Sequence, residues 1–195
     1  MGPPEHVAPG VALLELMLVN VGRHAVWIGH ADVYPSGLAL RVDLHGREPA
    51  PPDLESGPGT WRFGVQFSDG RKATTFGLGA FSVGGGVTAP GGVTAAAPSA
   101  RAATTVAVGH TGSPPEGPLL RPQGGGGSRT VWRQGYWLWP LPAPGELLIA
   151  CEWPNAGIEL TTATISADQL RVAASHAQEL WPLPDAPEWP GATGR

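Results

Sequence analysis

The feature that most constrains this chain is a pair of short, aromatic-rich runs between Val131 and Trp153. The first run reads VWRQGYWLWPLP, the second reads ELLIACEWP, and a Pro-Ala-Pro-Gly turn joins them. Aromatic residues favour the pleated, half-buried positions of strands, so two such runs around a turn predict a β-hairpin. This hairpin indicates an all-β fold, and it does not indicate an activity.

Alternation of apolar and polar residues predicts further strands. Between residues 38 and 45 the apolar positions are Leu38, Leu40, Val42 and Leu44. This period of two is that of a strand with one buried and one solvent-facing side. WRFGVQF, a Ser-Asp-Gly turn and RKATTF predict a hairpin over residues 61–76. The run over residues 11–19 is almost entirely apolar, which predicts a strand covered on both faces.

The C-terminal part of the chain carries one helix signal. Ser166 and Gln169 have the spacing of a capping box, in which each side chain caps the backbone N–H of the other residue. An apolar stripe at helical spacing follows: Leu170, Ala173, Ala174, Ala177, Leu180 and Trp181. Because Pro182 cannot continue a helix, we expect the helix to span residues 167–181.

Strands without alternating helices favour packed antiparallel sheets over a parallel α/β sheet. We therefore predict an antiparallel β-sandwich, Ig-like or jelly-roll-like, with one C-terminal α-helix. An open barrel is the alternative. The domain should span residues 11–182, between a flexible N-terminus (1–10) and a loose Pro-rich tail (183–195).

Residues 77–128 interrupt this pattern with Gly, Ala, Thr, Ser and Pro. They hold many of the chain's 29 Gly and 22 Pro, and they predict a long low-complexity insertion that is disordered or held by a partner. Deleting Gly84–Gly127 should then cost little stability, because loop-closure entropy changes slowly with loop length.

Charge and cysteine content exclude several classes of function. A net charge of −4, with eleven Arg, a single Lys and no basic run, argues against nucleic-acid binding. The apolar run at residues 11–19 is too short to cross a bilayer, and the N-terminus lacks the basic segment of a signal peptide. A lone Cys151 excludes an internal disulfide, and no zinc-ligand spacing or cofactor motif is present. We expect a cytoplasmic protein without a cofactor.

The string YWLWPLPAPGELLIACEWPNAGIEL is preceded by LLRPQGGGG and followed by an Ala-rich predicted helix that ends in Leu-Trp. In these motifs the chain resembles uncharacterised proteins of high-GC actinobacteria, over most of residues 11–182. The resemblance implies a compact cytoplasmic domain with a variable Gly-rich loop. It implies no activity and no functional residues.

The best polar cluster in the sequence contains His30 and Asp32, which share one face of a predicted strand. His30 could act as a base oriented by Asp32, the pair could supply two metal ligands, or both residues could simply face solvent. If residues 24–34 pair with residues 38–45, Arg41 and Asp43 join them on the same face.

The aromatic strand carries large rings on both faces. Its alternation places Trp132 and Tyr136 on one face and Trp137 and Trp139 on the other, with Gly135 as a candidate bulge. One pair can fill the interior of the sandwich. The other pair needs cover from the predicted helix, the Pro-rich tail or a partner, or it forms a platform for a flat ligand such as a glycan.

These patterns favour a non-catalytic β-sandwich that binds another protein or associates with itself, since no catalytic motif is present. One alternative is an enzyme or metal protein that uses the face of His30 and Asp32. A further alternative is a carbohydrate-binding module that uses exposed tryptophans. No catalytic residue and no metal ligand is assigned.

Overall fold

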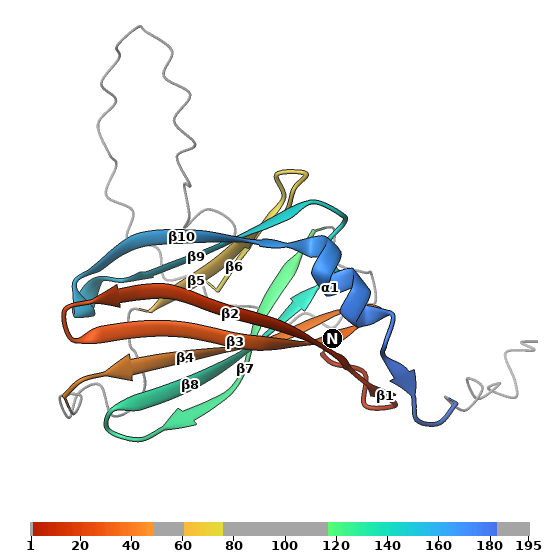
Figure 1. Ribbon diagram of the computed structural model, residues 1–195, viewed down its shortest axis with the longest axis horizontal. Coiled ribbons are helices and arrows are strands. Elements are labelled where there is room, and N and C mark those ends of the chain that lie inside the picture. The colour runs from red at the N-terminus through yellow and green to blue at the C-terminus, as the bar shows by residue number, and fades with distance from the viewer. Residues whose placement is uncertain (1, 49–60, 76–116, 183–195) are drawn as a thin grey trace, which may run out of the picture.

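Two antiparallel sheets dominate the computed structural model of this protein, which describes residues 2–48, 61–75 and 117–182 (Figure 1). The five-stranded sheet contains, in spatial order, β2 (Gly10–Val21), β3 (His24–Tyr34), β4 (Gly37–Gly46), β8 (Val131–Trp139) and β7 (Leu119–Gly127). The four-stranded sheet contains β10 (Ile158–Ser166), β9 (Glu146–Trp153), β5 (Arg62–Gln66) and β6 (Lys72–Thr74). A short 3-10 turn, η2 (Pro154–Ala156), connects β9 to β10. The predicted all-β antiparallel fold is confirmed.

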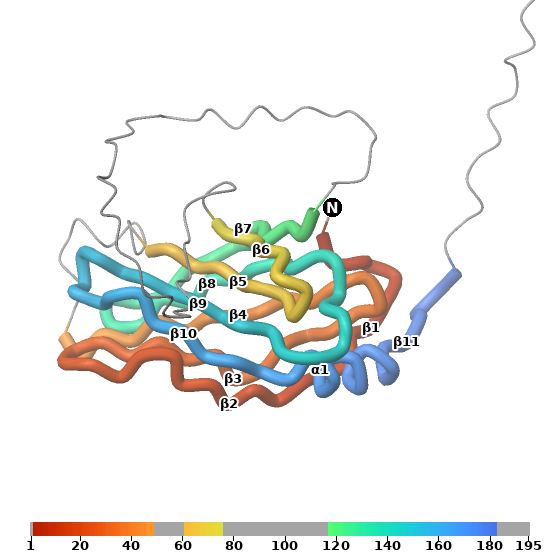
Figure 2. The backbone as a smooth tube through the Cα atoms, turned by 90° about the horizontal axis from the view of Figure 1, so that it is seen from above, coloured from red at the N-terminus to blue at the C-terminus, as the bar shows by residue number. Residues whose placement is uncertain are grey.

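The inner faces of the two sheets enclose one apolar core. The inward residues predicted for β4 are at most 2% exposed: Leu38, Leu40, Val42 and Leu44. Phe63 of β5 is fully buried, which confirms the predicted phase of that strand. At the sides of the sandwich, β10 lies beside β2 and β6 lies beside β7, so the two sheets nearly meet along both edges (Figure 2).

The helix is shorter than the sequence predicts. Helix α1 spans Ala167–Ala174 rather than residues 167–181. Beyond Ala174 the chain tightens into a turn and then forms β11 (Gln178–Glu179), which pairs with β1 (Val7–Ala8). Backbone pairing between the two ends of the chain replaces the last helical turns, a long-range contact that overrides local periodicity. Val7–Ala8, which lie within the N-terminus predicted to be flexible (1–10), are thus paired as a strand.

The predicted capping box is also absent. The Ser166 side chain makes no capping hydrogen bond at the start of α1. Instead, the Gln169 amide donates a hydrogen bond to the backbone carbonyl of Leu13 in β2. This contact fixes the helix against the edge of the five-stranded sheet, where α1 packs on β2, β3 and β9 and buries Leu170.

The predicted low-complexity insertion (77–128) ends earlier than expected, because residues 119–127 form β7. Two glycines of this strand, Gly125 and Gly127, lie close to β8. A Cβ atom on Gly127 would lie 1.9 Å from the Val131 carbonyl oxygen, and one on Gly125 would lie 2.6 Å from Gln134 Oε1. Glycine is thus required by packing at position 127, where the atoms in the way belong to the backbone. A Cβ on Gly125 would first meet the flexible end of the Gln134 side chain, and one on Gly124 or Gly126 would meet nothing within 4 Å. Residues 77–116 and the predicted tail, 183–195, lie outside the described residues.

Candidate binding surface on the five-stranded sheet

A β-bulge in β3 determines which side chains reach the outer face of the five-stranded sheet. The register of β3 against β4 shifts between Trp27 and Ala31. The inward residues of β3 are even-numbered before the bulge and odd-numbered after it, and all are fully buried: Val26, Ile28, Ala31 and Val33. Because the extra residue reverses the alternation, Trp27, His30 and Asp32 all face outward.

Cross-strand pairing then arranges the outer face in rows. One row runs from Val11 on β2 through Asp32 on β3 and Ala39 on β4 to Trp137 on β8. His30 is opposite Leu13 in the neighbouring row. Directly opposed residues of antiparallel strands share a face, so these side chains all lie on the outside of the sandwich.

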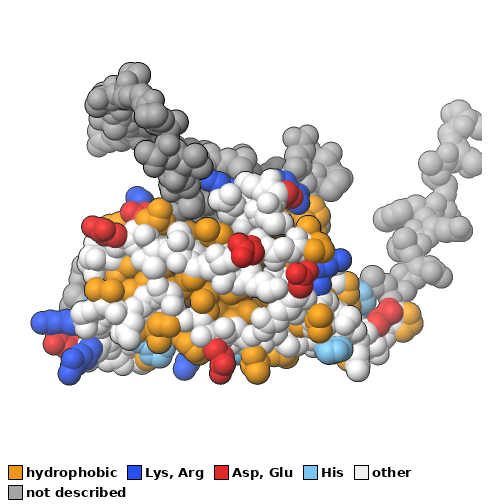
Figure 3. All heavy atoms as spheres, turned by 45° about the horizontal axis from the view of Figure 1, so that its top comes forward, with side chains coloured by type: hydrophobic (Ala, Val, Ile, Leu, Met, Phe, Trp, Pro, Cys, Tyr) orange, Lys and Arg blue, Asp and Glu red, His pale blue; other side chains and the backbone are white. Residues whose placement is uncertain are grey.

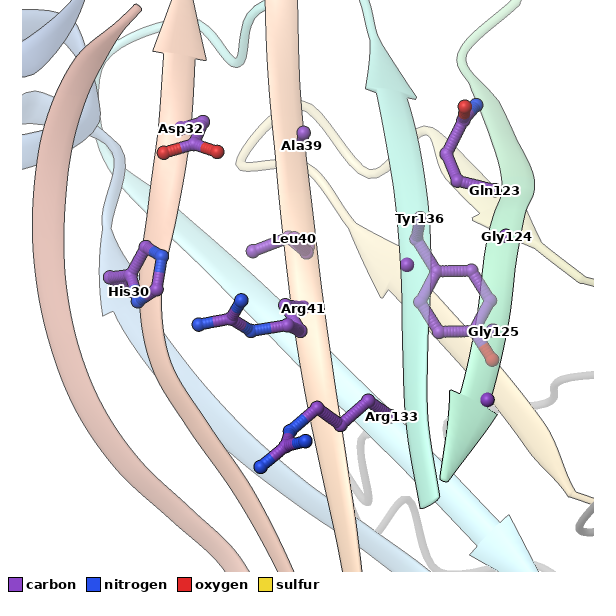
Figure 4. A pocket seen from close by; sticks show the side chains of 12 residues that line it. His30, Asp32, Ala39, Leu40, Arg41, Gln123, Gly124, Gly125, Arg133 and Tyr136 are labelled. Atoms are coloured by element: carbon purple, nitrogen blue, oxygen red, sulfur yellow. The ribbon is translucent and has the colours of Figure 1, made fainter. Parts of the chain in front are cut away.

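A shallow hollow of about 420 Å³ lies in the middle of this face. It is lined by His30, Asp32, Arg41 and Arg133, and by Gln123 and glycines of β7 (Figure 4). The outward positions at its floor are small, Ala39 on β4 and Gly135 on β8. The hollow therefore arises because small residues on the central strands are surrounded by longer ones.

Three of the four predicted polar residues line this hollow together: His30, Asp32 and Arg41. In Figure 4, the Arg41 side chain reaches from β4 toward His30 on β3. Among the described residues, no hydrogen bond joins His30 to Asp32, and Arg41 has no ion-pair partner. The geometry thus offers a charged surface facing open space rather than a base held by its carboxylate.

Asp43, the fourth predicted polar residue, does not line the hollow. Its carboxylate lies 3.7 Å from the Arg133 guanidinium, which is opposite it on β8. The Asp43 side chain is 20% exposed and the Arg133 side chain is 61% exposed. Asp43 therefore lies beside the hollow as the ion-pair partner of Arg133. The sequence does not predict Arg133 as a site residue, because the pairing of β4 with β8 is not visible in it.

Trp132 and Tyr136 face the interior, as Leu44 and Leu40 opposite them do. The Tyr136 hydroxyl accepts a 2.8 Å hydrogen bond from the Trp61 indole, and its ring stacks on Phe63 at a centroid distance of 4.7 Å. Burial raises the pKa of Tyr136, since the ionised form would lose its hydration. Of these two predicted binding residues, Tyr136 is buried in the core and Trp132 is partly buried and packs against it.

Trp137 faces outward but is only 1% exposed. Its ring lies edge-on to Tyr34, at a centroid distance of 5.6 Å, and over Gly37, where a Cβ atom would approach Trp137 Cζ2 to 2.8 Å. Helix α1 is one of the three covers that the sequence allows for this ring, but it packs on β2, β3 and β9 instead. Trp139 is partly buried. The aromatics of β8 thus form no exposed platform for a glycan.

The predicted bulge at Gly135 is in the neighbouring strand instead. The register of β4 with β8 is unbroken, whereas the register of β7 with β8 shifts between Pro122 and Gly125. The Gln134 amide donates hydrogen bonds to the Gln123 and Gly135 carbonyls at this point, 2.8 and 3.0 Å long. The bulge thereby places Gln123 and the glycines of β7 along one wall of the hollow.

An exposed apolar row on β2 lies beside the hollow. Val11, Leu13 and Met17 are 56, 67 and 48% exposed, although the sequence predicts a strand covered on both faces. Their cross-strand neighbours, Asp32, His30 and Trp27, place all three on the outer face of the sheet. On the side where β2 and β10 lie, hydrophobic side chains reach the surface among acidic ones (Figure 3). We call Val11, Leu13 and Met17 the apolar row.

Several classes of site find no support within the described ranges. No three His, Cys, Asp or Glu side chains there are grouped so that they could hold a metal ion. No helix in the described part of the chain is long and apolar enough to span a membrane. The chain matches no known protein-family profile, no curated protein and no solved structure.

Proposed function

We propose that this protein is a non-catalytic β-sandwich that binds another protein through the outer face of its five-stranded sheet. The apolar row carries the proposal: Val11, Leu13 and Met17 are about half exposed or more, in a strand whose sequence suits cover on both faces. Proteins seldom leave several large apolar side chains bare along one strand unless something binds there. A partner would supply the missing cover.

The neighbouring polar groups fit such a contact surface. Protein interfaces typically combine an apolar centre with charged and hydrogen-bonding groups, and arginine is enriched in them. Here Leu13 lies opposite His30, and Arg41 lies on the next strand. Complete burial of a Leu or Val side chain contributes about 1.5–3 kcal/mol, so covering this row could support a specific complex.

The edge of β2 is a poor place for strand addition. The Leu13 carbonyl already accepts the Gln169 side chain, and the register of β2 with β3 shifts twice, after Leu13 and after Met17. Glu15 between these points has a left-handed backbone conformation, with φ of 45°. Bulges and a charged residue are devices that prevent edge pairing. The proposed partner therefore contacts the outer face of the sheet, through side chains, and does not add a strand at the edge of β2.

A cytoplasmic location is part of the same proposal. Cys151, the one cysteine of the chain, is buried and unpaired, as is common where disulfides are rare. Catalysis by His30 and Asp32 receives less support from the geometry, since no hydrogen bond orients the imidazole toward this carboxylate.

Capture from a lysate of the producing cells tests the proposal, with Leu13→Asp as the probe and Leu160→Asp as the matched control on the four-stranded sheet. Leu160 is 41% exposed, so it accepts the same substitution without loss of core. We expect wild type and the control to retain one partner in stoichiometric amount, and Leu13→Asp to lose it. Trp137, being buried, is unsuitable as a probe because its removal would disturb the fold.

Sedimentation velocity of the purified chain completes this test. A concentration-dependent dimer that Leu13→Asp abolishes would identify the partner as a second copy of the chain. Absence of both a captured partner and self-association at high concentration would overturn the proposal.

A further inference from the structure

The hollow on the outer face gathers three nitrogen-bearing side chains around open space. Arg41 reaches from β4 toward His30 on β3, and Arg133 extends from β8 in the same direction (Figure 4). Within the described residues, neither Arg41 nor His30 has a hydrogen-bond or ion-pair partner. A guanidinium group is charged at all physiological pH values, so a positive charge faces this open space.

Among the described residues, no carboxylate forms an ion pair with Arg41 or His30, so the end of the hollow at these two residues is basic. The Asp43 carboxylate faces Arg133 as an ion pair at 3.7 Å, without a hydrogen bond. Asp32 lies opposite Ala39, one row away from Arg41, and forms no ion pair with a described residue. The hollow thus has a basic end, at Arg41 and His30, and an acidic end, at Asp32.

The size and shape of the hollow limit what it can hold. Its floor is made of small outward residues, Ala39 and Gly135, and its volume is about 420 Å³. It is shallow and open, so it suits a group presented by a larger molecule better than an enclosed small ligand. Leu13 of the apolar row borders it, because Leu13 is the cross-strand neighbour of His30.

We infer that this hollow is a carboxylate-binding site, which receives an acidic side chain from the protein segment that covers the apolar row. This inference rests on the proposed function. Arg41 is the main donor, because its planar guanidinium matches the two oxygens of a carboxylate. Asp32, at the other end, accepts an N–H group from the same segment and repels a second carboxylate. The two ends together fix the direction in which the segment lies.

An NMR titration of the ¹⁵N-labelled protein tests this inference. The probes are the blocked peptide acetyl-Val-Glu-Val-Glu-Val-amide, its glutamine analogue, and free citrate as a carboxylate source without a peptide. We expect shifts in the Arg41 side chain and in the Gly135 amide with the glutamate peptide and with citrate, and none with the glutamine peptide. Shifts spread over all arginines, or equal shifts with the glutamine peptide, would overturn the inference.

Two substitutions in the hollow have opposite expected effects. Arg41→Gln removes the main donor and should weaken binding of the glutamate peptide about two- to fivefold, the range for an exposed charge pair. Asp32→Asn removes a negative charge and should tighten citrate binding. Arg71→Gln, which makes the same charge change in the β5–β6 turn, should alter neither. An unchanged affinity of Arg41→Gln would overturn the inference.

Further measurements distinguish the peptide from citrate as the carboxylate source. They also distinguish failure of the partner-binding proposal from failure of the carboxylate site. Tighter binding of the glutamate peptide than of citrate supports a partner segment, whereas equal affinities would overturn that assignment. Leu13→Gln, which removes the apolar side chain without adding a charge beside His30, should leave citrate binding intact while partner capture is lost. If Leu13→Asp still captures the partner, the proposed function fails alone. If capture depends on Leu13 but no carboxylate binds, the carboxylate site fails alone.

Discussion

The Trp61 indole N–H donates a 2.8 Å hydrogen bond to the Tyr136 hydroxyl in the interior of the sandwich. Trp61 directly precedes β5 in the four-stranded sheet, and Tyr136 lies in β8 of the five-stranded sheet, so this bond joins the two layers. The Phe63 ring stacks on both the Trp61 ring and the Tyr136 ring. The inward rings of the aromatic strand therefore hold the sheets together.

Tyr136→Phe should lower the free energy of unfolding by about 1–3 kcal/mol, because it leaves the buried Trp61 N–H without an acceptor. Urea denaturation followed by tryptophan fluorescence measures this change. Tyr34→Phe is the control, since no described residue bonds to the Tyr34 hydroxyl, and it should cost less than about 0.5 kcal/mol. Equal costs for the two variants would show that the bond contributes nothing.

Gly37→Ala, at the start of β4 in the five-stranded sheet, should destabilise the fold by a steric clash. The added Cβ would lie 2.4 Å from the Leu138 carbonyl oxygen and 2.8 Å from Trp137 Cζ2, closer than real Cβ contacts. Overpacking of this kind costs about 1–3 kcal/mol. Thermal unfolding should show the loss. Gly124→Ala, where a Cβ would meet nothing within 4 Å, should leave the unfolding temperature nearly unchanged. A similar loss in both variants would rule out the clash as the cause.

Cys151 should make stability depend on pH in the alkaline range. Burial raises the pKa of its thiol from 9.0 to about 12. Between these values the unfolded chain has released a proton that the folded chain retains, so the free energy of unfolding falls as the pH rises, by at most about 1.4 kcal/mol per pH unit. Below pH 9 this thiol contributes no pH dependence.

Urea denaturation of wild type and Cys151→Ala at pH 8 and pH 10.5 measures this effect. The stability advantage of the wild-type chain over the variant should shrink at the higher pH, because the variant has no thiol to ionise. Alanine also keeps the position apolar, which limits the loss of core packing. The same difference at both pH values would show that the thiol ionises equally in the folded and unfolded chains.

The strands that the sequence predicts well are those with one buried face. In β4, the alternation of Leu38 to Leu44 with polar residues directly reports which side is covered, and the core contains these four leucine and valine side chains. β7 has no such signal, since glycines have no side chains to alternate. The end of α1 is equally hidden, because it depends on pairing between β11 and β1 at opposite ends of the chain.

The candidate site could be predicted in part. Two-residue spacing and an expected hairpin were enough to group His30, Asp32 and Arg41. Arg133 could not be found, because its place depends on β8 lying beside β4. The apolar sequence of β2 predicts cover on both faces, but a sequence does not say whether the cover belongs to the same chain. Leu13 is exposed in the folded chain, whereas Trp137 is buried, so a substitution of Leu13 tests cover by a partner without disturbing the fold.

Deletions in the low-complexity region should now separate into two classes. Removing Gly84–Gly127, which the sequence alone suggests is harmless, would also remove β7. β8 would lose its paired neighbour on one side, and the buried side chain of Leu120 would be lost from the core. We expect the free energy of unfolding to fall by more than about 2 kcal/mol, as for loss of a large buried apolar residue together with a strand's hydrogen bonds.

Removing only residues 84–116 should cost little, because it leaves every described strand in place and loop-closure entropy changes slowly with length. β6 and β7 lie side by side, so residues 76–83 are sufficient to connect them. Urea denaturation of both deletion variants compares the two outcomes directly. If the shorter deletion costs as much as the longer one, the stability depends on residues 84–116 themselves. A cost confined to the longer deletion would instead identify β7 as the element that completes the five-stranded sheet.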